Sequence, residues 1–110
     1  MLEAHKPTPV YKVAKQYQSD GERVYELDCA GVRLEIRVSS RSAGAGQRNW
    51  HVSAQPGGVS DATVLSESGA TKSEALTKVG AQWSEQDPAY ALPALDWTAV
   101  AQALVAVRGI

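Results

Sequence analysis

Apolar and polar residues alternate over residues 23–39, in two runs separated by Ala30 and Gly31. The apolar positions that share one face are Tyr25, Leu27, Cys29, Val32, Leu34, Ile36 and Val38. Alternation with a period of two over this length is typical of an antiparallel hairpin with one buried face. A two-residue turn would place Cys29 opposite Val32, so that the apolar faces of the two strands agree.

The segments that follow predict two more strands. Residues 49–55 alternate in the same way, with Trp50 on the inward face, and predict a third strand. Residues 62–67 predict a fourth strand, whose short length suits the edge of a sheet. Between the second and third strands, residues 40–48 are rich in serine, alanine and glycine and predict a loop.

The beginning of the chain is harder to interpret. Residues 1–9 contain two prolines and predict a tail. In residues 10–18, four apolar side chains follow the helical spacing i, i+3, i+4 and i+7, although part of the segment also alternates as a strand would. The helical interpretation is favoured, with a strand as the alternative. The single folded domain would then cover residues 10–110.

Two helices are expected after the strands. Thr71 and Glu74 have the spacing of a capping box, which predicts a helix beginning there and ending near Glu85. Its apolar stripe includes Gly80, which suggests that the helix backbone approaches the sheet closely there. Asp96 can cap a last helix that runs to about Arg108.

These elements predict an α+β fold in the order α-β-β-β-β-α-α. An antiparallel sheet of three to four strands would carry the two C-terminal helices on one face, with the short N-terminal helix before it. The expected core is Tyr25, Leu27, Val32, Leu34, Ile36, Trp50, Val52, Leu76, Val79, Trp83, Val100 and Leu104.

Composition narrows the classes of function. The chain has 110 residues, a net charge of −1 and one cysteine, Cys29. A single cysteine excludes an internal disulfide and a cysteine-rich zinc site. No run approaches the length of a membrane span and no secretory leader is visible, which predicts a cytoplasmic protein without membrane contact.

No residue pattern indicates catalysis, a cofactor or a metal. His51 lies on the outward face of its strand without ligand partners at metal-binding spacing. Glu26 and Glu35 would face each other across the hairpin, but the neighbouring Arg33 and Arg37 suggest a solvated, salt-bridged surface there. The sequence therefore predicts a protein that is not an enzyme.

The last helix is unusually apolar. Residues 99–107 read AVAQALVAV, in which Gln102 is the one polar residue. A helix that is apolar on nearly all sides either packs on the sheet with an alanine-lined outer face or meets another chain. The residues proposed for such an interface are Trp97, Val100, Ala101, Leu104 and Val105.

Four cations could contact nucleic acid: Arg33, Arg37, Arg48 and Lys72. The near-zero net charge weighs against this, since nucleic-acid binders usually show a basic excess or stripe. In the favoured register Trp50 points to the core, which leaves no aromatic platform on the open face.

Residues 68–83, SGATKSEALTKVGAQW, resemble the last strand and helix of double-stranded-RNA-binding domains. The stretch from Gly69 to Leu76 is also similar to the strand-to-helix junction of HicB-like antitoxin domains. The first resemblance implies RNA contact through a cationic helix start. That family expects further lysines where this chain has Ser73, Glu74 and Ala75 after Lys72, so most of the phosphate clamp is missing.

The sequence thus predicts a small interaction or regulatory domain that acts through protein–protein contact and associates with itself or with another protein. The alternative is a nucleic-acid-binding module with the layout of a double-stranded-RNA-binding domain.

Overall fold

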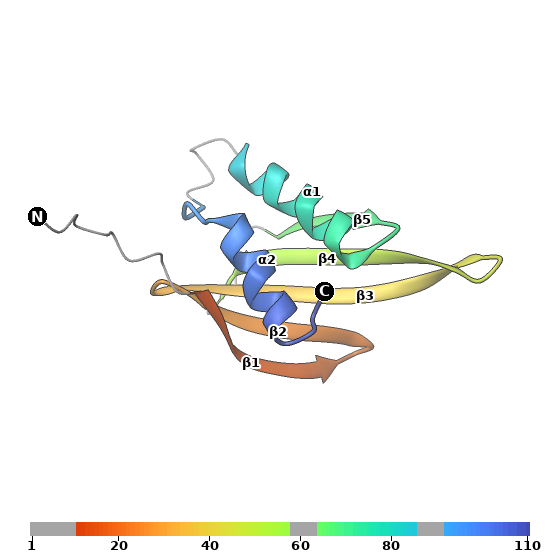
Figure 1. Ribbon diagram of the computed structural model, residues 1–110, viewed down its shortest axis with the longest axis horizontal. Coiled ribbons are helices and arrows are strands. Elements are labelled where there is room, and N and C mark those ends of the chain that lie inside the picture. The colour runs from red at the N-terminus through yellow and green to blue at the C-terminus, as the bar shows by residue number, and fades with distance from the viewer. Residues whose placement is uncertain (1–10, 58–63, 86–91) are drawn as a thin grey trace, which may run out of the picture.

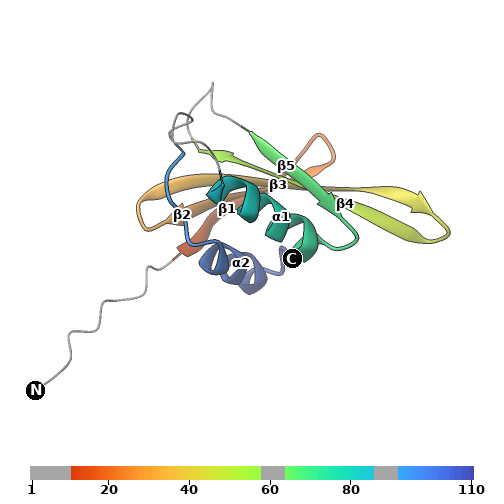
Figure 2. The same cartoon turned by 90° about the horizontal axis from the view of Figure 1, so that it is seen from above.

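Five strands, joined in chain order, form one antiparallel sheet in the computed structural model, which describes residues 11–57, 64–85 and 92–110. Two helices cover one face of this sheet, and the other face is open (Figures 1 and 2). The elements are β1 (Tyr11–Ser19), β2 (Glu22–Cys29), β3 (Val32–Gly44), β4 (Gln47–Pro56), β5 (Leu65–Gly69), α1 (Lys72–Ser84) and α2 (Trp97–Ala106). The α+β class with two C-terminal helices is confirmed.

The β2–β3 hairpin has the predicted turn and register. Ala30 and Gly31 form the two-residue turn, both with positive φ (54° and 92°). Cys29 pairs with Val32, and the pairing continues as the alternation requires. Two central residues with positive φ are typical of a type I′ turn, whose twist matches that of the flanking strands.

The expected helix over residues 10–18 is wrong, because residues 11–19 form strand β1. This strand raises the sheet from the expected three or four strands to five. The pairing of β1 with β2 shifts between Val13 and Lys15, at a β-bulge. A bulge inserts one residue and breaks the alternation, so the remaining pattern imitated helical spacing. The tail expected over residues 1–9 lies outside the described residues.

The expected loop over residues 40–48 is also wrong. Strand β3 continues to Gly44 and β4 begins at Gln47, so the two strands stay paired almost to their ends. Every side chain from residue 41 to residue 49 is exposed, so neither face required apolar residues. Hydrophobic alternation cannot reveal a ribbon of this kind. The last strand covers 65–69 instead of 62–67, and residues 62 and 63 lie outside the described part.

The core lies between the sheet and the two helices. α1 packs on β4 and β5, and α2 packs on β1 and β2. Ten of the twelve expected core residues are buried, and Val32 and Trp50 pack against the core while partly exposed. None of the described helices is long and apolar enough to cross a membrane.

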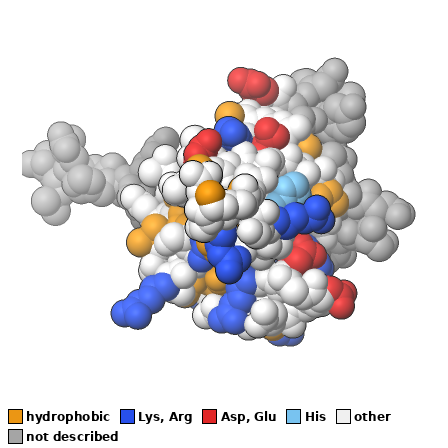
Figure 3. Space-filling model, turned by 90° about the vertical axis from the view of Figure 1, so that its right-hand side faces the viewer, with side chains coloured by type: hydrophobic (Ala, Val, Ile, Leu, Met, Phe, Trp, Pro, Cys, Tyr) orange, Lys and Arg blue, Asp and Glu red, His pale blue; other side chains and the backbone are white. Residues whose placement is uncertain are grey.

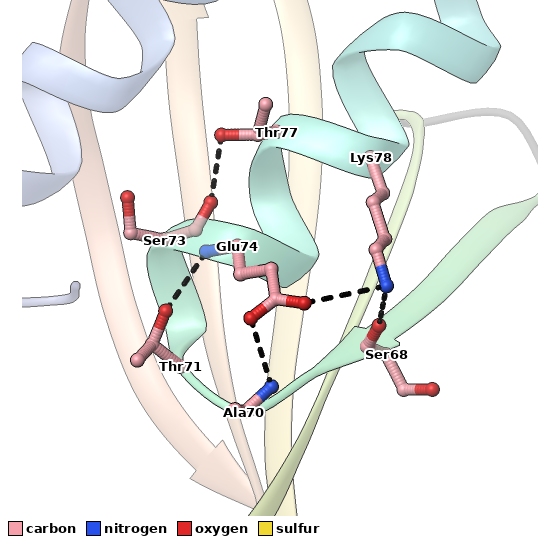
Figure 4. Close-up of polar contacts among 7 residues, drawn as sticks. All are labelled: Ser68, Ala70, Thr71, Ser73, Glu74, Thr77 and Lys78. Carbon is pink, nitrogen blue, oxygen red and sulfur yellow. Dashed lines mark hydrogen bonds and ion pairs between the residues drawn. The ribbon is translucent and has the colours of Figure 1, made fainter.

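Local capping explains where both helices begin. The Thr71 hydroxyl accepts a hydrogen bond from the Glu74 backbone N–H at 3.0 Å (Figure 4). The Glu74 carboxylate accepts from the Ala70 N–H at 3.2 Å, one residue earlier than a capping box requires, and pairs with Lys78. At α2, the Asp96 carboxylate accepts from the N–H groups of Thr98 and Ala99.

Gly80 provides a close approach, but to α2 and not to the sheet as expected. A Cβ atom on Gly80 would lie 2.9 Å from Cγ of Trp97. The Trp97 ring also meets Trp83 edge-on, with ring centroids 5.5 Å apart. The glycine therefore lets the first residue of α2 lie against the backbone of α1.

Candidate functional site

The sheet separates the four cations that the sequence put forward for nucleic-acid contact. Arg33 and Arg37 lie on the open face, where Arg33 faces Asp28 across the hairpin and Arg37 lies between Val24 and Ser53. Arg48 shares the face of Trp50 and Val52, and Lys72 begins α1. Arg48 and Lys72 therefore belong to the helix-covered side. The start of α1 lies at the end of the sheet nearest the β3–β4 turn (Figure 1).

The open face has the character of a salt-bridged, solvated surface, as the sequence predicted. Arg37 pairs with Glu35 at 3.2 Å and with Glu22 at 3.6 Å. The hydrogen bond that Arg37 donates to the Glu35 carboxylate is the main reason why the pKa of Arg37 rises above its usual value. Gln55 also donates to Glu35. Arg37 is thus already engaged, which leaves it little capacity for a ligand.

On the helix side, a hollow of about 400 Å³ lies beyond the ends of the two helices. Its lining combines cations with an apolar floor: Gln16, Arg23, Tyr25, Val38, Trp50, Lys72, Val107 and Arg108. These residues come from four strands, the start of α1 and the segment after α2. Arg48 lies two positions from Trp50 on the same face of β4 and borders this group.

We call the four cations Arg23, Arg48, Lys72 and Arg108, together with Trp50, the basic hollow. Neutral groups hold its side chains in place. Arg23 donates to the Gln16 side-chain carbonyl at 3.3 Å, and Arg48 donates to the Ser40 hydroxyl at 2.8 Å. The Lys72 ammonium lies 4.7 Å from the centre of the Trp50 ring, within the range of a cation–π contact.

Among the residues that the structure describes, no carboxylate lies within 4.0 Å of any of the four cations. The nearby acids have other partners: Glu22 pairs with Arg37, and Glu74 pairs with Lys78. Seen end-on, Lys and Arg side chains gather in the middle of this face, and acidic ones lie toward the top and the right of the view (Figure 3). None of these cations therefore forms an ion pair with a carboxylate of the described residues.

Arg108 reaches the basic hollow from an uncommon backbone conformation. Its φ is +58°, the left-handed region in which many helices place a glycine after their last turn. The backbone N–H of Gly109 donates to the carbonyl of Leu104 at 2.7 Å, which closes the end of α2. Gly109 itself has no positive φ, but a Cβ there would lie 3.1 Å from the Tyr25 ring.

The five residues proposed for a protein interface are divided by burial. Val100 and Leu104 are 0% exposed within the chain's own core. Trp97 and Ala101 are partly buried, and Val105 is exposed. The apolar character of α2 is thus used largely inside the domain.

Arg23 and Arg108 were not among the residues predicted from the sequence. Arg23 had a readable signal, since it lies two residues before Tyr25 and so falls on the inward face of β2. Arg108 had none, because its position depends on how the end of α2 meets the sheet.

Two further features that could carry chemistry would be a metal site and the thiol of Cys29. The described residues contain no group of three or more His, Cys, Asp or Glu side chains placed to hold a metal ion. Cys29 is buried, and that burial raises the pKa of its thiol to about 11, with the neighbouring Asp28 carboxylate adding to the effect. Comparisons with protein-family models, curated proteins and solved structures found no match to this chain.

Proposed function

We propose that this domain binds nucleic acid and that the basic hollow holds the phosphate backbone. The observation that supports this is the convergence of Arg23, Lys72 and Arg108 around one hollow that Arg48 borders, without a carboxylate partner among the described residues. Cations that serve only the fold are usually paired or scattered over a surface. Here four elements that are distant in sequence bring them together.

The chemistry of the basic hollow suits phosphate. Arginine presents several N–H donors in a rigid fork that matches phosphate oxygens, and lysine adds a compact charge. The start of α1 lies at the same place and contributes the positive end of its dipole. The partly exposed indole of Trp50 can contact a sugar or a base. A net charge of −1 does not oppose this function, because the charge is unevenly distributed.

Fluorescence anisotropy with labelled oligonucleotides tests the proposal. If all four cations contact phosphates of a duplex, the association constant should fall with salt with a slope of about −3.6 on a log–log plot. Between 50 and 200 mM salt this corresponds to a loss of roughly 100-fold in affinity. Absence of binding to any oligonucleotide at low salt would contradict the proposal.

Matched substitutions on the two sides of the sheet provide the control. Arg23→Gln or Lys72→Gln should weaken binding and reduce the salt slope by about one, since each removes one phosphate contact. Arg33→Gln removes an exposed arginine from the open face and should leave binding close to that of the native chain. An equal loss in all three variants would indicate a general charge effect and not a site.

A further inference from the structure

The paired ends of β3 and β4 project from the body of the domain as a two-stranded ribbon. We call residues 41–49 the arm. It extends past both helices (Figures 1 and 2). One of its residues, Arg48, also borders the basic hollow. All of its residues are exposed, whereas β2, β3 and β4 outside the arm bury side chains in the core. A ribbon without apolar contacts adds little to stability, so its length calls for another explanation.

The side chains of the arm are small or can donate hydrogen bonds. It contains Arg41, Ser42, Gln47, Arg48 and Asn49 around a tip of glycine and alanine. Aspartate and glutamate are absent not only from the arm but from the whole stretch 36–60. Phosphate groups therefore meet no like charge along this part of the chain.

The pairing of the strands puts one arginine on each face of the arm. Arg41 lies opposite Asn49 on the face that continues the open side of the sheet. Arg48 lies opposite Ser42 on the face that continues into the basic hollow. Because successive side chains of a strand point to opposite faces, both faces of the ribbon carry a donor-rich pair.

We infer that the arm enters the major groove of duplex DNA while the basic hollow holds the adjacent phosphates. This inference rests on the proposed function and adds the class of nucleic acid. The major groove of B-DNA is about 12 Å wide and 8.5 Å deep, and it admits a two-stranded β-ribbon. Four residues per strand at roughly 3.4 Å each give the arm a reach of about 14 Å, enough to touch the bases.

The donors of the arm match the base edges of that groove. Arginine forms paired hydrogen bonds with guanine, and asparagine or glutamine with adenine. The small tip, with Gly44, Ala45 and Gly46 all at positive φ, turns the chain within the width of the ribbon. Duplex RNA has a deep, narrow major groove that such a ribbon does not enter, so DNA is the duplex expected.

Three probes of one sequence test the inference: a DNA duplex, an RNA duplex and single-stranded DNA. The DNA duplex should bind the native chain most tightly. Arg41→Gln or Asn49→Ala should weaken binding to the DNA duplex about tenfold, the loss expected for one paired contact to a base edge. Their effect on RNA duplex and single-stranded DNA should be small. Because both side chains are exposed, unfolding in urea should be unchanged.

Arg33→Gln is the matched control on the body of the same sheet face, and guanine N7 protection from methylation reports occupancy of the major groove. Equal affinity for DNA and RNA duplexes, or arm variants that bind like the native chain, would overturn the inference. If Arg23→Gln still weakened binding in that case, the basic hollow would stand without the arm. If none of the probes bound at low salt, both proposals would fall.

Discussion

Arg108 occupies a backbone position that usually belongs to glycine, and this makes it informative at the scale of the single residue. A non-glycine residue in the left-handed region costs about 1 kcal/mol or more relative to glycine. Such strain is often found where the side chain serves a function. Here the side chain lines the basic hollow, for which we propose phosphate binding.

Replacing Arg108 by glycine should therefore separate stability from binding. Arg108→Gly is expected to raise the free energy of unfolding by about 1 kcal/mol, because the strain is relieved. The same variant should bind nucleic acid less tightly. Urea unfolding and anisotropy measure the two effects, and Arg108→Lys, which keeps both charge and strain, should change neither much. A less stable glycine variant would show that the arginine supports the fold instead.

Titration of the Cys29 thiol should make the stability of the domain depend on pH. Its thiol holds a proton in the folded chain up to a pKa of about 11, compared with an ordinary value of 9.0. Between these values the folded state binds more protons than the unfolded state, so stability falls as pH rises. The contribution is fully present below about pH 9 and is lost through about pH 11.

The comparison of the native chain with Cys29→Ala isolates this effect, because tyrosines and lysines titrate in both. Relative to Cys29→Ala, the native chain should lose at most about 3 kcal/mol of unfolding free energy as pH rises through this range. In the folded native chain the buried thiol should also react slowly with a disulfide reagent. A difference that stays constant with pH would contradict the raised pKa.

At the scale of the elements, the contact between α1 and α2 depends on the absence of a side chain at Gly80. In an exposed helix, glycine to alanine stabilises by about 1 kcal/mol. At Gly80 the new Cβ would meet Cβ and Cγ of Trp97 at 3.1 and 2.9 Å, atoms near the backbone that cannot swing away. Overpacking of this kind costs about 1–3 kcal/mol.

Gly80→Ala should therefore destabilise the domain by about 1–2 kcal/mol, since the clash outweighs the helix propensity. Thermal or urea unfolding measures this. In a chain that already carries Trp97→Ala the clash is absent. Adding Gly80→Ala to that chain should therefore leave its stability unchanged or increase it. A stabilised single variant would mean that α2 yields easily and that the two helices are loosely joined.

The elements also show which patterns were readable in advance. The β2–β3 register, Thr71 and Asp96 were predictable because each rests on contacts within a few residues. β1 was not, because its bulge disrupts the alternation, and the arm was not, because both of its faces are exposed. Hydrophobic periodicity reveals a strand only when one face is buried along its whole length. It therefore misses a strand with two exposed faces and a strand whose alternation is interrupted by a bulge.

For the whole molecule, self-association through α2 stays a prediction. Fewer of the five residues proposed for the interface are accessible than the sequence suggested. Val100 and Leu104 are fully buried, so replacing them would unfold the chain and prove nothing about an interface. Val105, 58% exposed, is the side chain whose substitution tests the surface alone. The edge strand β1 carries Lys12, Lys15 and a bulge, features that oppose pairing between sheets.

Sedimentation velocity of the native chain and of Val105→Lys decides the matter. If α2 mediates a dimer, the native chain should sediment as a dimer at micromolar concentration and the variant as a monomer, with unfolding in urea unchanged. Thr98→Lys places the same charge on an exposed position about two turns earlier and maps the extent of the contact. A native chain that sediments as a monomer would contradict self-association.

The sequence by itself determined the α+β class, the central hairpin and the starts of both helices, because alternation, turn geometry and capping act between near neighbours. Only the tertiary structure decided which cations share a site. Arg33 and Arg48 looked equivalent in the sequence, yet the sheet places them on opposite sides. Arg23 and Arg108 are 85 positions apart and meet because α2 packs back across β1 and β2. Such proximity depends on the packing of the core, which no local pattern encodes.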